Sequence, residues 1–179
     1  MIRKIILLIL ATSYMVASSC NIDNNSNLNQ YSTSNNNTGM ASMPNNLNQN
    51  EVLELKKLLN SHLEIAKEEK KPHIVIIAKE SCPYANQLLE GILSNKKFKN
   101  VLRQNFVLTI IESSYIPAFP EFYTDNSPTL FFLDYQGFFF TDAYNGMPKS
   151  LDDFSLYLEK MKDYHNNILI PSLEKGEGN

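Results

Sequence analysis

A short apolar run followed by a cysteine and a proline constrains this chain more than any other feature. The run His73 to Ala78 is rich in β-branched residues and lies between Pro72 and polar residues, which predicts a buried strand. Cys82 and Pro83 follow it, and then come apolar residues at helical spacing: Leu88, Leu89, Ile92 and Leu93. Because proline is favoured at a first helical position, we expect Cys82 at the N-terminus of a helix.

A thiol at a helix N-terminus meets unpaired backbone N–H groups and the positive end of the helix dipole, which favour the thiolate. The carboxylate of Glu80 works the other way, and strand alternation is expected to place Lys79 on the opposite face. The pattern therefore indicates a reactive Cys82. The alternative is a small buried apolar residue, which is a common fate of free cysteine.

The four residues Cys82-Pro83-Tyr84-Ala85 resemble the redox site of thioredoxin-like proteins, which normally reads Cys-x-x-Cys in this strand-to-helix turn. The resemblance implies that Cys82 is the attacking, catalytic cysteine and that Pro83 and Tyr84 contact the substrate. It also implies that Ser127 and Pro128 bind an extended substrate, with a cis peptide bond at Pro128 facing the cysteine. The alternative for Pro128 is an ordinary trans proline that opens a strand.

This sequence departs from the family pattern at three positions. Ala85 replaces the second, resolving cysteine, and Ile76 stands where the family has a buried acid. Ser81 replaces the tryptophan that commonly precedes the first cysteine. These departures indicate mixed-disulfide or isomerase-like exchange through a single cysteine in place of dithiol reduction.

The order of predicted elements gives the fold class. A strand, a helix and a second strand in sequence predict a parallel pair with a right-handed crossover. The predicted helices begin at Glu51, Pro83, Ser94 and Ser150, and the predicted strands cover 73–78, 106–111, 129–133 and 138–141. This order resembles the α/β thioredoxin-like fold: helix, β-α-β, β-hairpin and C-terminal helix around a four-stranded mixed sheet. We expect this domain at residues 51–170.

The N-terminus has the pattern of a secretion signal over residues 1–19. Arg3 and Lys4 precede an apolar stretch, and small residues precede Cys20. The stretch is shorter than the roughly 20 residues of a membrane span. The small residues and Cys20 resemble a bacterial lipobox, although Ala17 stands at the usual leucine position. The resemblance implies that Cys20 is lipidated; the alternative is an ordinary cleaved signal with a free Cys20.

The predicted lipid anchor sets the expected location and the cysteine count. The resemblance implies a bacterial cell-envelope protein whose domain faces the periplasm or the exterior. Residues 20–50 are predicted to be a disordered tether, because twelve of the thirty residues at 21–50 are Asn. Residues 171–179 are predicted to be a flexible tail. If Cys20 is lipidated, Cys82 is the sole thiol and has no intramolecular partner, although a homodimer through Cys82 stays open.

Several partner classes are not expected. The formal net charge of −3, without a basic stripe, argues against nucleic acid. The three histidines, His62, His73 and His165, lack metal-ligand spacing, so we expect no metal, and no phosphate-binding glycine loop points to a cofactor. The expected partners are protein or low-molecular-weight thiols and disulfides, and the membrane through the lipid.

Two hypotheses follow from the sequence. The first is thiol-disulfide exchange through Cys82. The second is a non-catalytic binding module that keeps the fold and its groove for a partner protein.

Overall fold

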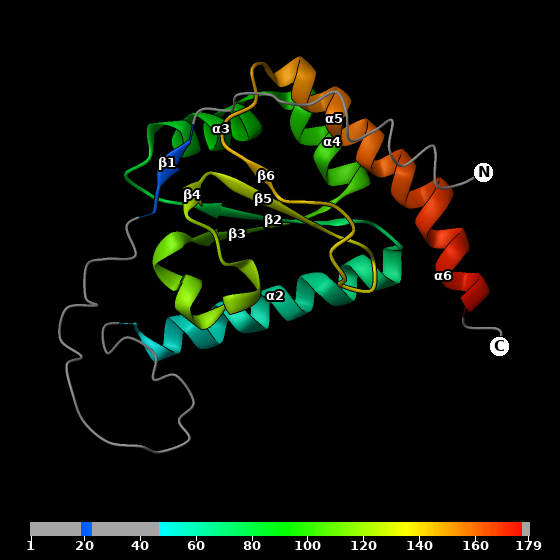
Figure 1. Cartoon of the computed structure of the whole chain (residues 1–179), viewed down its shortest axis with the longest axis horizontal. Coiled ribbons are helices and arrows are strands. Elements are labelled where there is room, and N and C mark those ends of the chain that lie inside the picture. The colour runs from blue at the N-terminus through cyan, green and yellow to red at the C-terminus, as the bar shows by residue number, and fades with distance from the viewer. Residues whose placement is uncertain (1–18, 23–46, 177–179) are drawn as a thin grey trace.

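The computed structural model describes residues 19–22 and 47–176 of the chain (Figure 1). A central four-stranded sheet has the order β3-β2-β5-β6. These strands are β2 (His73–Ala78), β3 (Val107–Glu112), β5 (Thr129–Leu133) and β6 (Tyr144–Asn145). β3 runs parallel to β2, whereas β5 is antiparallel to β2 and β6 is antiparallel to β5. All six residues of β2 are buried, as expected for a β-branched central strand.

Helices cover both faces of this sheet (Figure 1). One face packs against α3 (Pro83–Ser94), α4 (Lys96–Asn105) and α5 (Leu151–Tyr164). The other face packs against α2 (Gln49–Glu69) and two 3₁₀ helices, η2 (Ser113–Ala118) and η3 (Pro120–Phe122). Alternation along β2 divides its side chains between two core clusters, with Ile74 and Ile76 toward α3 and Val75 and Ile77 toward α2.

Two very short strands pair outside the central sheet. β1 (Cys20–Asn21) is antiparallel to β4 (Asn126–Ser127), and Cys20 lies opposite Ser127. Figure 1 shows β1 beside β4 at the end of the sheet nearest the start of α3. The predicted tether began at residue 20, so the pairing of β1 with the domain was not expected.

The predicted α/β architecture of helix, β-α-β, hairpin and C-terminal helix is confirmed. The fourth strand of the sheet lies at Tyr144–Asn145, later than predicted. The predicted strand 138–141 forms one isolated bridge, between Phe139 and Leu133, before the chain leaves the sheet.

The C-terminal helix is longer than predicted. After α5, a π-helical turn η4 (His165–Leu169) leads into α6 (Ile170–Gly176), so residues 171–176 of the predicted flexible tail are helical. His165 ties this extension to the domain: its ring is buried and its Nε2 accepts a hydrogen bond from the backbone N–H of Tyr135 at 3.2 Å. Residues 177–179 lie outside the described residues, as do residues 1–18 of the predicted signal and residues 23–46 of the predicted tether.

Within residues 19–22 and 47–176, none of the helices combines the length and apolarity that crossing a membrane requires.

Candidate functional site

Cys82 lies at the junction that the sequence pattern predicted. It is the N-cap residue of α3, with extended backbone angles, and Pro83 opens the first turn. The backbone N–H of Cys82 donates to the carbonyl of Lys79 at 2.9 Å, which fixes the turn out of β2. Only 1% of Cys82 is exposed. The sulfur is therefore at the positive end of the helix and is shielded from solvent.

The Ser127–Pro128 peptide bond faces this turn and is cis. Ser127 is buried, and its Oγ accepts a hydrogen bond from the backbone N–H of Lys79 at 2.7 Å. The Sγ of Cys82 lies 3.2 Å from the Ser127 carbonyl oxygen, a contact in which a reduced thiol would donate. The structure thus brings together Cys82, Ser127 and Pro128, which are far apart in the sequence.

Cys82 is bonded to Cys20. The two cysteines form a disulfide with a Cα–Cα distance of 5.9 Å, and they are separated by 62 residues in the sequence. The sequence-based expectation of a Cys82 without an intramolecular partner therefore does not hold in this structure. That expectation assumed a lipid on the Cys20 sulfur, and one sulfur atom cannot carry both a thioether and a disulfide. The even number of cysteines allows such a pair but does not by itself predict it.

The segment Ser19–Ile22 lies along β4 and the start of α3. Besides the β1–β4 pairing, the backbone N–H of Ile22 donates to the Asp125 carbonyl at 2.7 Å. Ser19 Oγ donates to Asn126 Oδ1 at 3.2 Å, and Lys79 Nζ donates to the Asn21 carbonyl at 3.4 Å. Lys79 thus contacts this segment at the end of β2. Sequence reasoning missed these contacts because it placed the segment in a tether.

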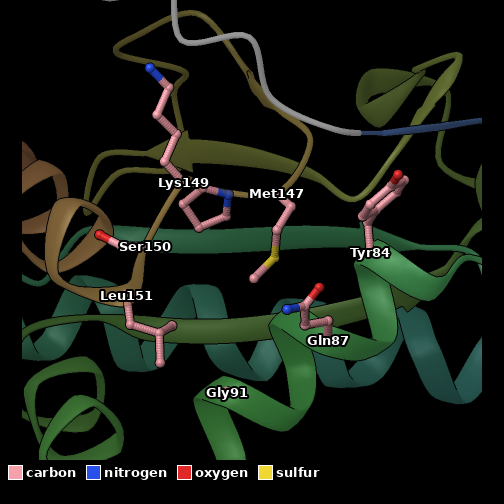
Figure 2. Close-up of a pocket in the computed structure, with 8 residues that line it drawn as sticks. Tyr84, Gln87, Gly91, Met147, Lys149, Ser150 and Leu151 are labelled. Atoms are coloured by element: carbon pink, nitrogen blue, oxygen red, sulfur yellow. The ribbon is translucent and has the colours of Figure 1, made fainter.

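Tyr84 is the second residue of α3, directly after Pro83. Its side chain is partly exposed and borders a pocket of about 480 Å³ between α3 and the segment that leads into α5 (Figure 2). Cys82 is not among the residues that line this pocket, which are Tyr84, Gln87, Gly91, Met147, Pro148, Lys149, Ser150 and Leu151. Of the predicted substrate contacts, Ser127 and Pro128 therefore adjoin the cysteine, while Tyr84 belongs to this separate hollow.

Two of the three positions that depart from the family pattern are packed in the core, whereas Ser81 is exposed. Ala85 has no exposed surface and Ile76 is 1% exposed, and both belong to the cluster on the α3 face. Neither side chain can attack a disulfide or carry a proton near Cys82. Glu80 is exposed, so water screens the effect of its carboxylate on the cysteine.

The histidines lie away from the cysteine. His73 is at the opposite end of β2 from the Cys82 turn, and its Nε2 is 2.7 Å from Thr109 Oγ1. His62 Nδ1 contacts the same oxygen at 2.7 Å, and His165 is at the C-terminal helix. Among the described residues, no group of three or more His, Cys, Asp or Glu side chains is arranged to hold a metal ion.

Several aromatic residues of segments 115–123 and 138–140 pack within the fold, whereas Tyr123 and Phe138 are exposed. Phe119 and Phe122 are buried in the α2-side core cluster. The ring of Phe139 lies 5.8 Å from those of Phe122 and Phe131, and Phe140 stacks on Tyr164. This run serves the packing of the hairpin.

Comparisons with known proteins agree with this geometry. The sequence profile of a family described as a thioredoxin-like domain matches residues 59–162, which is more than half of the chain. No curated protein matches the sequence.

Solved structures resemble this chain at low identity, and the first of the two below shares the fold. A disulphide isomerase from Xylella fastidiosa Temecula1 has a TM-score of 0.51 and 16% identity, over 65% of this chain and 99% of that chain. The oxidised C-terminal domain of DsbD from Neisseria meningitidis has a TM-score of 0.48 and 16% identity, over 59% of this chain and 93% of that chain. At this identity the likeness describes the fold alone.

Proposed function

Because this chain belongs to the family of thioredoxin-like domains, we propose that it carries out thiol-disulfide exchange through Cys82. The observation that carries the proposal is the position of Cys82, at the start of α3 and facing cis-Pro128, where it forms a disulfide with a strand-paired cysteine. A site that holds one disulfide in this geometry has the arrangement that a mixed disulfide needs.

In the proposed reaction, the Cys82 thiolate attacks one sulfur of a substrate disulfide. The new bond joins Cys82 to that sulfur, and the other substrate sulfur leaves as a thiolate. The N-terminus of α3 favours the thiolate form of Cys82. Ser127 and Pro128 would align the extended substrate beside the cysteine.

The second step determines the kind of exchange. Ala85 has no sulfur with which to attack the mixed disulfide, so the adduct is resolved by a second thiol of the substrate or by a low-molecular-weight thiol. Resolution by the substrate's own thiol leaves the number of disulfides unchanged, which is isomerisation. We therefore propose mixed-disulfide or isomerase-like chemistry for this site.

We also propose that the mature protein is anchored in a bacterial cell envelope through a lipid on Cys20, with its domain facing the periplasm or the exterior. In that form the Cys20 sulfur is a thioether and Cys82 is a free thiol. Mass spectrometry of the N-terminal peptide from membrane extracts tests this assignment. A diacylglyceryl mass on Cys20 supports it, and an unmodified or disulfide-bonded Cys20 in all molecules refutes it.

A non-catalytic binding module remains the second candidate. The specific observations in its favour are the buried Ala85 and Ile76, which replace the groups used for release and proton transfer in the family pattern. In this case the groove near Pro128 would hold a partner segment without any exchange.

The rate of Cys82 alkylation against pH separates the two candidates. The chain carries Cys20→Ser, so that Cys82 is the one remaining thiol. A midpoint well below the free-thiol value of about 8.5, together with release of thiol from a disulfide probe, supports exchange. A midpoint at or above that value, with labelling only after unfolding, would refute exchange and support the non-catalytic binding module.

A further inference from the structure

We infer that the edge of β4 beside Cys82 is a binding site for an extended peptide with a cysteine and, two positions later, an aliphatic residue. We further infer that Ser19–Ile22 of this chain is an internal occupant of that site. The inference deepens the proposed function, on which it rests, by naming the substrate class.

The backbone of Ser19–Ile22 is bound as a strand. Cys20 and Asn21 pair antiparallel with Ser127 and Asn126, immediately before cis-Pro128. The Ile22 N–H extends this pairing through its hydrogen bond of 2.7 Å to the Asp125 carbonyl. Backbone hydrogen bonds of this kind hold a segment of any sequence, so they explain affinity for an extended chain but not selectivity.

Selectivity comes from the two side chains that enter the domain. Cys20 packs against the α3-side core cluster and bonds to Cys82. Ile22 is 9% exposed and belongs to the core cluster on the opposite face of the sheet. That cluster also contains Phe122 of η3 and Phe119, the residue before η3. The segment therefore bridges both cores at the end of the sheet, with one anchor in each.

The position between these anchors is open. Asn21 is exposed, and the contact from Lys79 reaches its backbone carbonyl and not its side chain. A ligand can therefore carry varied side chains at this position. The site specifies cysteine, then any residue, then an aliphatic residue.

Occupation by the chain's own segment closes the site. A substrate cysteine can reach Cys82 only after the Cys20–Cys82 disulfide is cleaved and the segment leaves β4. With glutathione, cleavage is balanced as follows: one disulfide and two glutathione thiols give the Cys20 and Cys82 thiols and one glutathione disulfide. A lipid on the Cys20 sulfur would prevent closure, because no thiol is then left to form the disulfide.

The equilibrium constant of that reaction measures how well the segment fits. The full-length chain is produced without export, so that Cys20 carries no lipid, and is equilibrated with reduced and oxidised glutathione. Ile22→Ser removes the aliphatic anchor, and Asn21→Ser is the matched control at the open position. Because Ile22→Ser removes a buried apolar side chain from the closed form, we expect it to favour the reduced, open form by tenfold or more. Asn21→Ser should change the constant by about twofold or less.

Equal constants for the wild type and Ile22→Ser would overturn the aliphatic position. The mass of the non-reduced protein checks the occupant. A monomer mass with no free thiols supports the internal segment, whereas a disulfide-linked dimer would overturn it. Neither readout requires a fast or activated Cys82, so both can succeed even if the proposed exchange activity fails.

A peptide probe tests the same site in trans. The chain with Cys20→Ser is mixed with a hexapeptide containing Ser-Cys-Asn-Ile, whose cysteine forms a disulfide with a chromophoric aromatic thiol. A matched peptide has serine in place of isoleucine. About tenfold faster release of the chromophore from the isoleucine peptide supports the substrate class, and equal rates overturn it. No release from either peptide would instead count against the proposed exchange function, while the glutathione equilibrium still decides the site.

Discussion

Ala85 occupies the position from which a second cysteine would resolve a mixed disulfide on Cys82. It lies in the first turn of α3 and is fully buried in the α3-side cluster. In a chain that also carries Cys20→Ser, Ala85→Cys supplies an intramolecular nucleophile one turn from Cys82. Well-oriented intramolecular groups reach effective concentrations on the order of 10⁵ M. We therefore expect the new cysteine to release the adduct several orders of magnitude faster than a millimolar external thiol does.

The measurement is the decay of a preformed glutathione adduct on Cys82, followed by mass spectrometry. Ala85→Ser is the matched control, because it has similar size and no thiol. Equal decay rates in the two variants would show that position 85 does not face the Cys82 sulfur.

His73 makes the stability of the fold depend on pH. Its ring is fully buried, and burial, together with the nearby His62, lowers its pKa from 6.5 to about 4. Its Nδ1 has no hydrogen-bond partner among the described residues. Between these two pH values the unfolded chain binds a proton that the folded chain does not, so stability is full above pH 6.5 and falls as the pH drops toward 4.

This linkage predicts a loss of about 2 kcal/mol in the free energy of unfolding between pH 7.5 and pH 5 from His73 alone. His73→Gln removes the titrating ring and retains a polar group that can contact Thr109, so its urea unfolding should depend less on pH in this range. His62→Gln should have a smaller effect, because His62 is only partly buried. An unchanged pH dependence in His73→Gln would contradict the assignment.

At the scale of elements, the strength of the local pattern decided what could be predicted. β2, α3 and α5 have long apolar runs or clear helical spacing, and each is found where the pattern places it. β6 has two residues, Tyr144 and Asn145, next to a glycine, so its sequence is typical of a turn. It is a strand because β5 supplies its pairing partner, which is information that no local window contains.

The start of α5 gives a test of local capping. Ser150 is the N-cap, and its Oγ accepts a hydrogen bond from the backbone N–H of Asp153 at 3.0 Å. Ser150→Ala leaves that N–H without its cap, which should cost about 1 kcal/mol in urea unfolding. Ser155→Ala, within the same helix, is the matched control and should be neutral or slightly stabilising because alanine favours helix interiors. Equal stability of the two variants would count against a capping role for Ser150.

At the scale of the whole molecule, the candidate site could be predicted only in part. Cys82 was identifiable because a strand-to-helix turn leaves a local signal, and Pro128 was identifiable through the resemblance to thioredoxin-like proteins. The bond to Cys20 leaves no such signal, since its partner lies 62 residues away, before a long Asn-rich stretch. The lipobox resemblance also assigned the Cys20 sulfur to a different use.

The Cys20–Cys82 disulfide predicts a redox-dependent stability of the whole domain. By restricting the unfolded chain over a loop of this length, the bond should stabilise the unlipidated protein by about 4 kcal/mol in the chain-entropy model. Urea unfolding with and without dithiothreitol measures the difference, because the reductant removes the bond without changing the sequence. The Cys20→Ser chain is the control and should unfold alike in both conditions. If the wild-type chain also unfolds alike in both, the disulfide does not link the N-terminal segment to the domain in solution, and Cys82 is a free thiol in the unlipidated protein.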